Sequence, residues 1–341
     1  MKILFICGSY PPEKCSNADT SAIMVDILNK KGLDVEVMSN IDWKLSNWRN
    51  IRKIIKKSQA DIIYIQYPGM GYKFSITPQI LSFLNRRRVI VTLHEVSQLH
   101  IIRKLSLLPF SFCKRIMFTN NFERNYFHKI YAWTKQNKTG KIPIGSNIST
   151  YLDLPLKDRN RNQIVYFGQI RPKKGIEEII ELAKLIKKND LNYTVIIMGR
   201  TYEKFYDFYQ EMLALTEDTN ISWLIDVSEK RVSEILGSNV IAYLPFPDGA
   251  SERRGSLFAA LSHHMIVFTT KGGQSLQEMN NCVTYINTPV DFFNYLIQDY
   301  NINTLMTDEK NKNSNINAFM NQYSWDVIMN QYIEEFKKVR Q

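Results

Sequence analysis

The sequence alternates between short apolar runs and amphipathic stretches, and it does so twice. Apolar runs such as KILFIC (2–7) and DIIYIQY (61–67) have the length and composition of buried strands. Stretches such as SAIMVDILNKKG (21–32) carry apolar residues at helical spacing and end in glycine. Strands that alternate with helices predict parallel sheets covered by helices on both faces, which is the α/β class.

A polar stretch at residues 153–163, DLPLKDRNRNQ, interrupts this alternation, and IVYFGQI (164–170) restarts it. The chain has 341 residues, enough for two domains of ordinary size. We therefore expect two Rossmann-like parallel-sheet domains facing a cleft, with boundaries at 1–155 and 160–324.

Open parallel sheets bind ligands where their strands end. The loops after residues 7, 67, 95, 168, 200 and 246 are therefore candidates to line that cleft. In the loop GSYPP (8–12), backbone amides of Gly8 and Ser9 could approach a ligand closely. The loop lacks the spacing of a dinucleotide fingerprint, and the chain contains no ATPase phosphate loop.

Cations cluster in YFGQIRPKKG (166–175), directly after an expected strand. Arg171, Lys173 and Lys174 precede Gly175 and the start of a helix. Three cations at a strand end form an electropositive rim that suits phosphate. A solvated basic turn would explain the same residues without a ligand.

Two adjacent arginines, Arg253 and Arg254, precede a helix that we expect to begin near Gly255 and Ser256. Each cation at a helix N-terminus is unfavourable by roughly 0.3–1 kcal/mol. A diphosphate would neutralise the arginines and accept hydrogen bonds from the helix, for which Ser256 is a good N-cap. Alternatively, the arginines turn outward to two nearby carboxylates, Asp248 and Glu252.

Metal and disulfide chemistry find little support. The four cysteines are scattered without a Cys-x-x-Cys pair, which indicates reduced thiols. His263 and His264 are neighbours on a helix and so point in different directions. The chain also lacks the Asp-x-Asp signature that binds a diphosphate through a metal. We expect no metal site and no cofactor.

Five short motifs, in this order along the chain, resemble those of the retaining, nucleotide-sugar-dependent glycosyltransferases of family 4, which have the GT-B fold. They are TLHE (92–95), IPIGSNIS (142–149), YFGQIRPKKG (166–175), LPFPDGASERRGSLFAALSHHMIVFTT (244–270) and YSWDVIMNQYIEEFKKV (323–339). The resemblance covers nearly the whole chain. It implies a GT-B fold in which a C-terminal helix at 325–341 crosses back to the first domain.

The resemblance also implies roles for single residues. Lys174 would hold the donor diphosphate with Arg171 or Arg253, and His94 would lie near the donor sugar and the leaving phosphate. The predicted catalytic residues are Lys174, His94 and Arg171. The predicted donor-binding residues are Gly8, Ser9, Gly168, Gln169, Arg200, Asp248, Ser251, Arg253, Arg254, Gly255 and Ser256. The predicted acceptor-side residues are Tyr10, Tyr67 and Glu95. For His94, a strand-end histidine that only satisfies backbone groups remains an alternative.

The chain departs from the family pattern at three positions. Many members carry two glutamates eight residues apart where this chain has Ser251 and Ala259, and an arginine where it has Gln169. In the family the second glutamate holds the ribose hydroxyls, which Ala259 cannot do. The nucleotide base and the sugar therefore stay open, and a non-catalytic GT-B subunit that supports a partner transferase stays an alternative.

Charge is distributed unevenly. Residues 1–150 hold 23 Lys and Arg against 9 Asp and Glu, whereas residues 151–341 hold 21 against 24. Cations and large apolar residues mix in 48–57, 85–88 and 101–118. This pattern predicts peripheral contact with an anionic membrane, next to a glycan or lipid-linked acceptor.

A nucleic-acid partner is disfavoured, because the chain lacks the usual binding motifs. No stretch reaches the roughly 18 apolar residues of a membrane span. We expect a cytoplasmic protein, with the inner face of the cell membrane as an alternative location. The expected activity is that of a hexosyl- or N-acetylhexosaminyl-transferase, with a UDP-sugar as a candidate donor, in surface polysaccharide or glycoconjugate synthesis.

Overall fold

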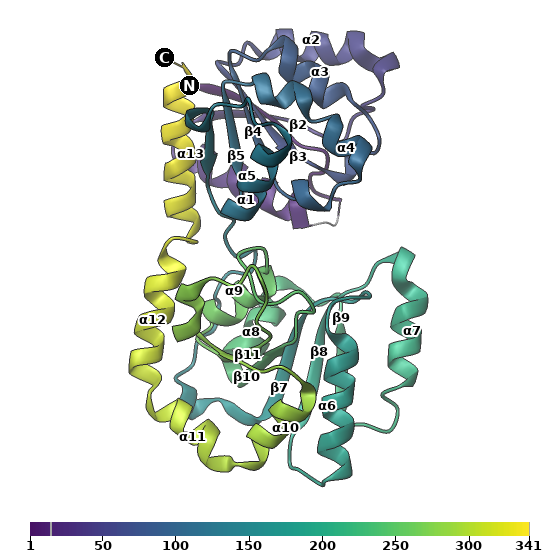
Figure 1. Ribbon diagram of the computed structural model, residues 1–341, viewed down its shortest axis with the longest axis vertical. Helices are drawn as coiled ribbons and strands as arrows, with labels where there is room; N and C mark the ends of the chain where they lie inside the picture. Colours follow the sequence, from purple (N-terminus) through teal and green to yellow (C-terminus); the bar gives the residue numbers. More distant parts are fainter. Residues whose placement is uncertain (14–15, 341) are drawn as a thin grey trace. The chain divides into compact units, whose positions relative to one another are not determined.

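The computed structural model describes residues 1–13 and 16–340, and the chain divides into two compact units (Figure 1). The first unit comprises Met1–Asn147 with Tyr323–Gln341, and the second comprises Ile148–Gln322. Each unit contains a six-stranded sheet in which every strand pair is parallel. The α/β class predicted from the alternating pattern is confirmed.

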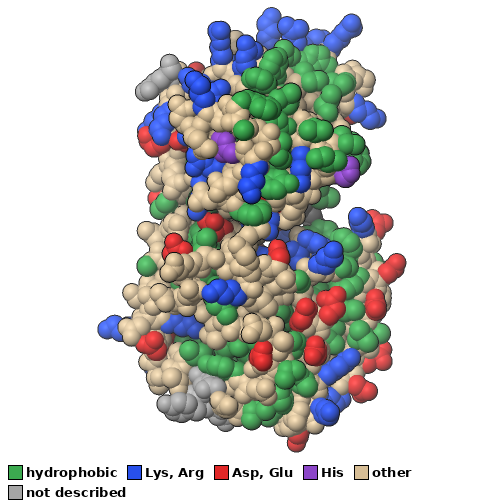
Figure 2. All heavy atoms as spheres, viewed as in Figure 1, with side chains coloured by type: hydrophobic (Ala, Val, Ile, Leu, Met, Phe, Trp, Pro, Cys, Tyr) green, Lys and Arg blue, Asp and Glu red, His purple; other side chains and the backbone are tan. Residues whose placement is uncertain are grey.

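The sheet of the first unit has the strand order β2-β1-β3-β4-β5-β6. Its strands are β1 (Lys2–Ile6), β2 (Asp34–Met38), β3 (Ile62–Tyr67), β4 (Val89–Leu93), β5 (Arg115–Phe118) and β6 (Thr139–Lys141). Its α-helices are α1 (Ser16–Lys30), α2 (Trp48–Ser58), α3 (Thr77–Leu84), α4 (Ile101–Leu105), α5 (Asn121–Ile130) and α13 (Trp325–Arg340). In the space-filling view, Lys and Arg side chains gather over α2 of this unit (Figure 2).

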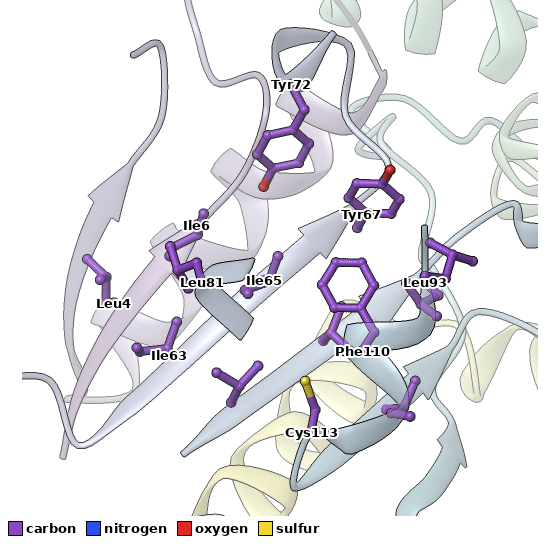
Figure 3. Packing of buried hydrophobic residues seen from close by; sticks show 14 of the residues in the cluster. Leu4, Ile6, Ile63, Ile65, Tyr67, Tyr72, Leu81, Leu93, Phe110 and Cys113 are labelled. Atoms are coloured by element: carbon purple, nitrogen blue, oxygen red, sulfur yellow. The ribbon is translucent and has the colours of Figure 1, made fainter. Parts of the chain in front are cut away.

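Both faces of this sheet are buried. Successive side chains of a strand point to opposite faces, and on this sheet each set belongs to an apolar cluster. Leu4 and Ile6 of β1 belong to one apolar cluster, together with Tyr67, Tyr72 and Phe110 (Figure 3). Ile3 and Phe5 belong to a second cluster, which includes side chains of α1 and α13. Burial on both faces explains why these strands read as continuous apolar runs rather than as alternating ones.

The C-terminal helix α13 packs on the first sheet. The ring of Tyr332 meets that of Tyr64 of β3 edge-on at 5.4 Å between centroids, and its hydroxyl lies 3.1 Å from Thr92 Oγ1. Arg115 Nε of β5 donates a hydrogen bond to Glu335 at 2.5 Å. The predicted return of the C-terminal helix to the first domain is therefore confirmed.

The sheet of the second unit has the order β12-β11-β10-β7-β8-β9. Its strands are β7 (Asn160–Gln169), β8 (Thr194–Arg200), β9 (Ile221–Ile225), β10 (Asn239–Leu244), β11 (Ile266–Thr269) and β12 (Val283–Tyr285). Its α-helices are α6 (Ile176–Lys188), α7 (Tyr206–Ala214), α8 (Glu229–Ser238), α9 (Gly255–Ser262), α10 (Pro289–Ile297), α11 (Asp299–Thr307) and α12 (Glu309–Asn321).

The polar stretch 153–163, which interrupts the alternation in the sequence, is not wholly a connection between the two sheets, because its last residues belong to strand β7. Strand β7 begins at Asn160, where it pairs with Asn239 of β10, and Gln163 pairs with Thr194 of β8. The side chains of residues 160–162 are exposed, so hydropathy gave no sign of a strand there. A helix with both the length and the apolar sequence needed to cross a bilayer is not found within residues 1–13 and 16–340.

Candidate functional site

The second sheet has a switch point between β7 and β10. From β7 the chain continues outward to β8 and β9, and it then returns to the other side of β7 as β10. In open α/β sheets, ligands bind outside the carboxyl ends of the strands at such a point. The loops that follow β7 and β10, at residues 170–175 and 245–254, are therefore the first place to look for a site.

These two loops touch through their backbones. Gly175 has a φ of +83°, and a Cβ at this position would lie 2.0 Å from the carbonyl oxygen of Pro245. Only glycine combines this conformation with so close an approach. Gly175 is also the N-cap of α6. Since glycine has no side chain, it cannot accept hydrogen bonds from the first N–H groups of that helix through a side-chain cap.

Cations from both loops act electrostatically on one buried phenol. Burial raises the pKa of Tyr166 in β7, while the positive charges of Arg254 and Arg171 act against this rise. The Tyr166 hydroxyl donates to the carbonyl oxygen of Lys174 at 2.9 Å, which ties the loop after β7 to the strand. The structure thus brings Arg171, Lys174 and Arg254 to the switch point.

Gln169 and Tyr202 orient Arg171. Arg171 Nε donates to Gln169 Oε1 at 3.0 Å, and Gln169 Nε2 donates to the Tyr202 hydroxyl at 3.1 Å. Gln169 also pairs in register with Arg200, the last residue of β8. The sequence drew attention to Gln169, Arg171 and Arg200, but it missed Tyr202. Tyr202 follows β8, and it comes close to the loop after β7 only because β7 and β8 are neighbours in the sheet and end side by side.

The two arginines before α9 contact a carboxylate. Arg253 Nη2 lies 3.3 Å from Asp248 Oδ2, and Arg254 contacts the same side chain. The Arg254 guanidinium also lies over the Phe246 ring, 4.6 Å from its centroid. The alternative, in which the arginines turn outward to Asp248 and Glu252, is met for the contact with Asp248 but not for the outward turn, because both arginine side chains are largely buried.

The start of α9 differs from the prediction in one detail. Its N-cap is Arg254, Gly255 is its first residue, and no side-chain cap is formed by Arg254. The prediction that Ser256 caps the helix is wrong, because Ser256 already lies inside the first turn. A Cβ added to Gly255 would meet no atom within 4 Å among the described residues. Packing therefore does not require glycine here, and the space beside this backbone is open.

The loop before α9 is anchored on its other side. Gly249 has a φ of +86°, and a Cβ there would lie 2.2 Å from the Gly272 nitrogen. Ala250 N donates to Thr270 O at 2.9 Å, and Ser275 Oγ donates to Ala250 O at 2.7 Å. These contacts with the segment after β11 fix the position of the arginine pair.

Two positions of the family pattern have distinct surroundings. Ser251 is 3% exposed, and its hydroxyl has no hydrogen-bond partner among the described residues. Ala259 is fully buried on the inner side of α9, and its carbonyl oxygen lies 2.7 Å from His263 Nδ1. Ala259 therefore offers no side-chain oxygen that could hold a ribose hydroxyl.

The first sheet has its own switch point, between β1 and β3. A Cβ on Gly71 would lie 1.7 Å from the carbonyl oxygen of Gly8, and one on Gly8 would lie 2.9 Å from the Gly69 Cα. Ser9 Oγ accepts a hydrogen bond from Gly71 N at 3.2 Å. Gly8 and Ser9 thus hold two loops together at the strand ends. Tyr10 follows them and is half-buried.

His94 follows β4 at the same edge of the first sheet. Its side chain is 6% exposed, and burial lowers its pKa to about 4, so the ring is neutral at pH 7. His94 Nε2 lies 3.2 Å from Gln66 Oε1, and its backbone N–H donates to the carbonyl oxygen of Tyr67. Gln66 is not among the residues predicted from the sequence, although an isolated amide within an apolar strand indicates a buried polar contact.

Tyr67 and Glu95 differ in accessibility. The Tyr67 ring is buried between Tyr72 and Phe110, and its hydroxyl accepts from Gln79 Nε2 at 3.0 Å (Figure 3). Glu95 is exposed. The predicted residues of the first domain therefore share one sheet edge, where Tyr10 and Glu95 are the more accessible ones.

The adjacent histidines have separate partners. His263 contacts Ser233 Oγ at 2.7 Å, whereas His264 contacts Asp153 at 2.7 Å and Asn317 at 2.9 Å. Within the described ranges, no group of three or more His, Cys, Asp or Glu side chains could hold a metal ion.

Comparison with known proteins adds to this geometry. Residues 152–248 match a family model described as "Glycosyl transferases group 1". No curated protein matches the sequence. Among solved structures, a glycosyltransferase from Rickettsia africae ESF-5 has a TM-score of 0.71 at 16% identity, over 99% of this chain and 98% of that chain.

Two further structures were solved with ligands. The Anabaena protein HepE, in complex with UDP and glucose, has a TM-score of 0.71 at 17% identity, over 99% of this chain and 100% of its own. The catalytic domain of starch synthase IV from Arabidopsis thaliana, bound to ADP and acarbose, has a TM-score of 0.66 at 12% identity, over 99% of each chain. The predicted GT-B fold is confirmed for the whole chain, and the predicted family resemblance is confirmed by the match of residues 152–248.

Proposed function

We propose, from the family match of residues 152–248 and the GT-B fold, that this chain is a glycosyltransferase that uses a nucleotide diphosphate sugar as donor. The observation that carries the proposal is that Arg171, Lys174 and Arg254 lie in the two loops that touch at the switch point of the second sheet. Cations at the carboxyl ends of parallel strands, beside open helix N-termini, suit a diphosphate.

The proposed catalytic contribution is electrostatic. Departure of the nucleotide leaves negative charge on the diphosphate, and preorganised positive groups that stabilise such charge usually contribute most to the rate enhancement of an enzyme. Lys174 and Arg171 would act from the loop after β7, and Arg253 and Arg254 from the loop before α9. The open space beside Gly255 would let a phosphate oxygen approach the first N–H groups of α9.

We propose that this transfer needs no metal ion, because four side-chain cations are available to neutralise the diphosphate. Activity that persists in a chelator would support this part of the proposal. We further propose that the acceptor hydroxyl attacks the face from which the nucleotide leaves, so that the anomeric configuration is retained. NMR of the product's anomeric proton distinguishes retention from inversion.

The acceptor would bind at the edge of the first sheet, where Tyr10 and Glu95 are accessible. His94, neutral because of its burial, would serve as an uncharged hydrogen-bonding group rather than as a cation. The basic composition of residues 1–150 supports an anionic or lipid-linked glycan as acceptor. A hexose or N-acetylhexosamine carried by UDP is the proposed donor, and the UDP complex of HepE supports the choice of base.

A second candidate is a non-catalytic GT-B subunit that supports a partner transferase. The buried Ala259 favours it, because a ribose-binding carboxylate is absent from this position in the chain. This candidate predicts a folded chain that consumes no donor by itself.

An assay of donor consumption separates the two candidates. The protein would be incubated with UDP-glucose, UDP-galactose, UDP-N-acetylglucosamine and GDP-mannose, with and without a lipid extract as acceptor source, while nucleotide release is followed. We expect one donor to be consumed by the wild type and not by Lys174→Ala. Consumption of no donor, together with no nucleotide binding, would contradict the enzyme and favour the supporting subunit.

A further inference from the structure

Exposed apolar side chains are concentrated in one part of the first unit. Of the 18 large hydrophobic residues that are exposed among the described residues, 13 lie between Leu45 and Trp133. Scattered exposed apolar residues need no explanation, whereas a contiguous group marks an interaction surface. Green and blue side chains lie side by side over this part of the unit (Figure 2).

The helix α4 carries three of these exposed residues. Ile101, Ile102 and Leu105 are 61%, 70% and 62% exposed, and the helix has no buried residue. Phe74, in the segment between β3 and α3, is 92% exposed. We call Phe74, Ile101, Ile102 and Leu105, with Lys73 and Arg103, the α4 surface.

Direct contacts make the α4 surface continuous. Arg103 donates to the carbonyl oxygen of Lys73, and its guanidinium lies over the Phe74 ring, 5.1 Å from the centroid. Behind it, Gln79 Nε2 of α3 donates to Ser106 Oγ at 3.3 Å. These contacts hold the segment around Phe74 against α4, so that the exposed apolar side chains of both belong to one surface.

The sequence around the α4 surface is strongly basic. Residues 43–122 contain fourteen Lys and Arg but only two carboxylates, Asp61 and Glu95. Helix α2 alone contributes five cations and no acidic residue. Long aliphatic side chains amid cations are the composition that binds at the interface of an anionic bilayer, where apolar groups enter the acyl boundary and cations meet lipid headgroups.

We propose that the first unit docks on an anionic lipid bilayer through the α4 surface, with Phe74, Ile101 and Ile102 entering the interface and the surrounding cations contacting the headgroups. A bilayer fits this surface better than a protein partner, because α4 combines exposed aliphatic side chains with cations and has no carboxylate. The sequence predicted membrane contact through basic stretches of the first 150 residues. The proposal assigns the apolar part of that contact to Phe74, Ile101 and Ile102. It is independent of the proposed transfer reaction, since docking is measured without turnover.

Vesicle flotation tests the proposal with three proteins. The full chain would be mixed with vesicles of phosphatidylcholine alone or with added phosphatidylglycerol. We expect wild type to float only with the anionic vesicles, and high salt to weaken this binding. The variant Phe74→Gln/Ile101→Gln/Ile102→Gln should bind the same vesicles at least roughly tenfold more weakly. The control variant Leu215→Gln/Val290→Gln/Ile297→Gln removes three exposed apolar residues of the second unit and should bind like wild type.

The outcomes separate the bilayer from other occupants. Circular dichroism and thermal unfolding of both variants establish that they fold. Equal binding by wild type and the α4-surface variant, or no binding to anionic vesicles, would overturn the proposal. A wild-type dimer in sedimentation that becomes monomeric only in the α4-surface variant would overturn it too, because a second copy would then cover the surface.

Discussion

The guanidinium of Arg253 lies 3.3 Å from the carboxylate of Asp248 in the loop that leads into α9. Arg254 contacts the same carboxylate, and both arginine side chains are largely buried, at 11% and 12% exposed, while that of Asp248 is 54% exposed. A single accessible carboxylate thus holds two guanidinium groups at the mouth of a helix. The arrangement keeps the arginines in place.

Removing the charge of Asp248 is expected to strengthen nucleotide binding. A diphosphate competes with this carboxylate for the same donors, so Asp248→Asn should lower the Kd for the preferred nucleoside diphosphate by about two- to fivefold. A half-exposed ion pair is worth roughly 0.5–1 kcal/mol, which corresponds to this factor. Isothermal calorimetry at low and high salt measures the change. Weaker binding by Asp248→Asn would indicate that the carboxylate serves only to position the arginines.

Two glycines of the site are expected to respond differently to alanine. Gly175→Ala places a Cβ 2.0 Å from Pro245 O at a positive φ, so it should lower the free energy of unfolding of the second unit by about 1–3 kcal/mol. Gly255→Ala meets no atom within 4 Å among the described residues and lies in a helix, so it should leave stability unchanged or raise it by about 0.5–1 kcal/mol. Thermal unfolding distinguishes the two variants.

Nucleotide binding by the Gly255→Ala variant tests directly whether a phosphate group approaches the start of α9. If a phosphate approaches the start of α9, the added methyl group should weaken binding roughly tenfold or more without loss of stability. Wild-type affinity in this stable variant would show that the phosphate does not use the space beside Gly255.

Burial of His94 predicts a pH dependence of stability. Its pKa is lowered to about 4 from 6.5, so between these values the unfolded chain binds a proton that the folded chain does not. The stabilisation is complete above pH 6.5 and is lost as the pH falls toward 4. Between pH 7 and pH 5, this group should lower the free energy of unfolding of the first unit by about 2 kcal/mol.

His94→Gln is expected to remove that contribution. Amide exchange of β3 and β4 reports the free energy of opening at both pH values, and the difference between wild type and variant isolates His94 from other titrating groups. An identical pH dependence in both proteins would mean that the imidazole is not held neutral by burial.

Much of the fold could be predicted because its signals are local. The strands around Ile63 and Ile241 are buried on both faces, so they read as continuous apolar runs. The start of β7 at Asn160 could not be predicted, because its first residues are exposed and pair through backbone groups that carry no side-chain pattern. The alternation therefore predicted two sheets, but it did not predict that strand β7 begins at Asn160, before the apolar run 164–170.

The candidate site was predictable as a set of loops but not as a set of contacts. Strand ends pointed to Arg171, Lys174 and the arginine pair, whereas the choice of Asp248 as partner of both arginines depends on how the loop turns at Gly249. Tyr202 escaped notice because it lies on a different strand end from the residue that it contacts. The exposure of Ile101 and Ile102 likewise depends on tertiary packing, which the sequence pattern alone does not specify.

The central claim is that Lys174 helps to bind a nucleoside diphosphate at the switch point of the second sheet. Calorimetric titration of UDP, GDP and ADP into wild type, Lys174→Ala and Lys173→Asn tests it most directly. Lys173 is the matched control, because it is an adjacent exposed cation whose positive φ of 63° asparagine tolerates. We predict that one nucleotide binds wild type and Lys173→Asn with affinities within a few-fold, and binds Lys174→Ala at least roughly tenfold more weakly. Binding of no nucleotide, or equal losses in the two variants, would contradict the account.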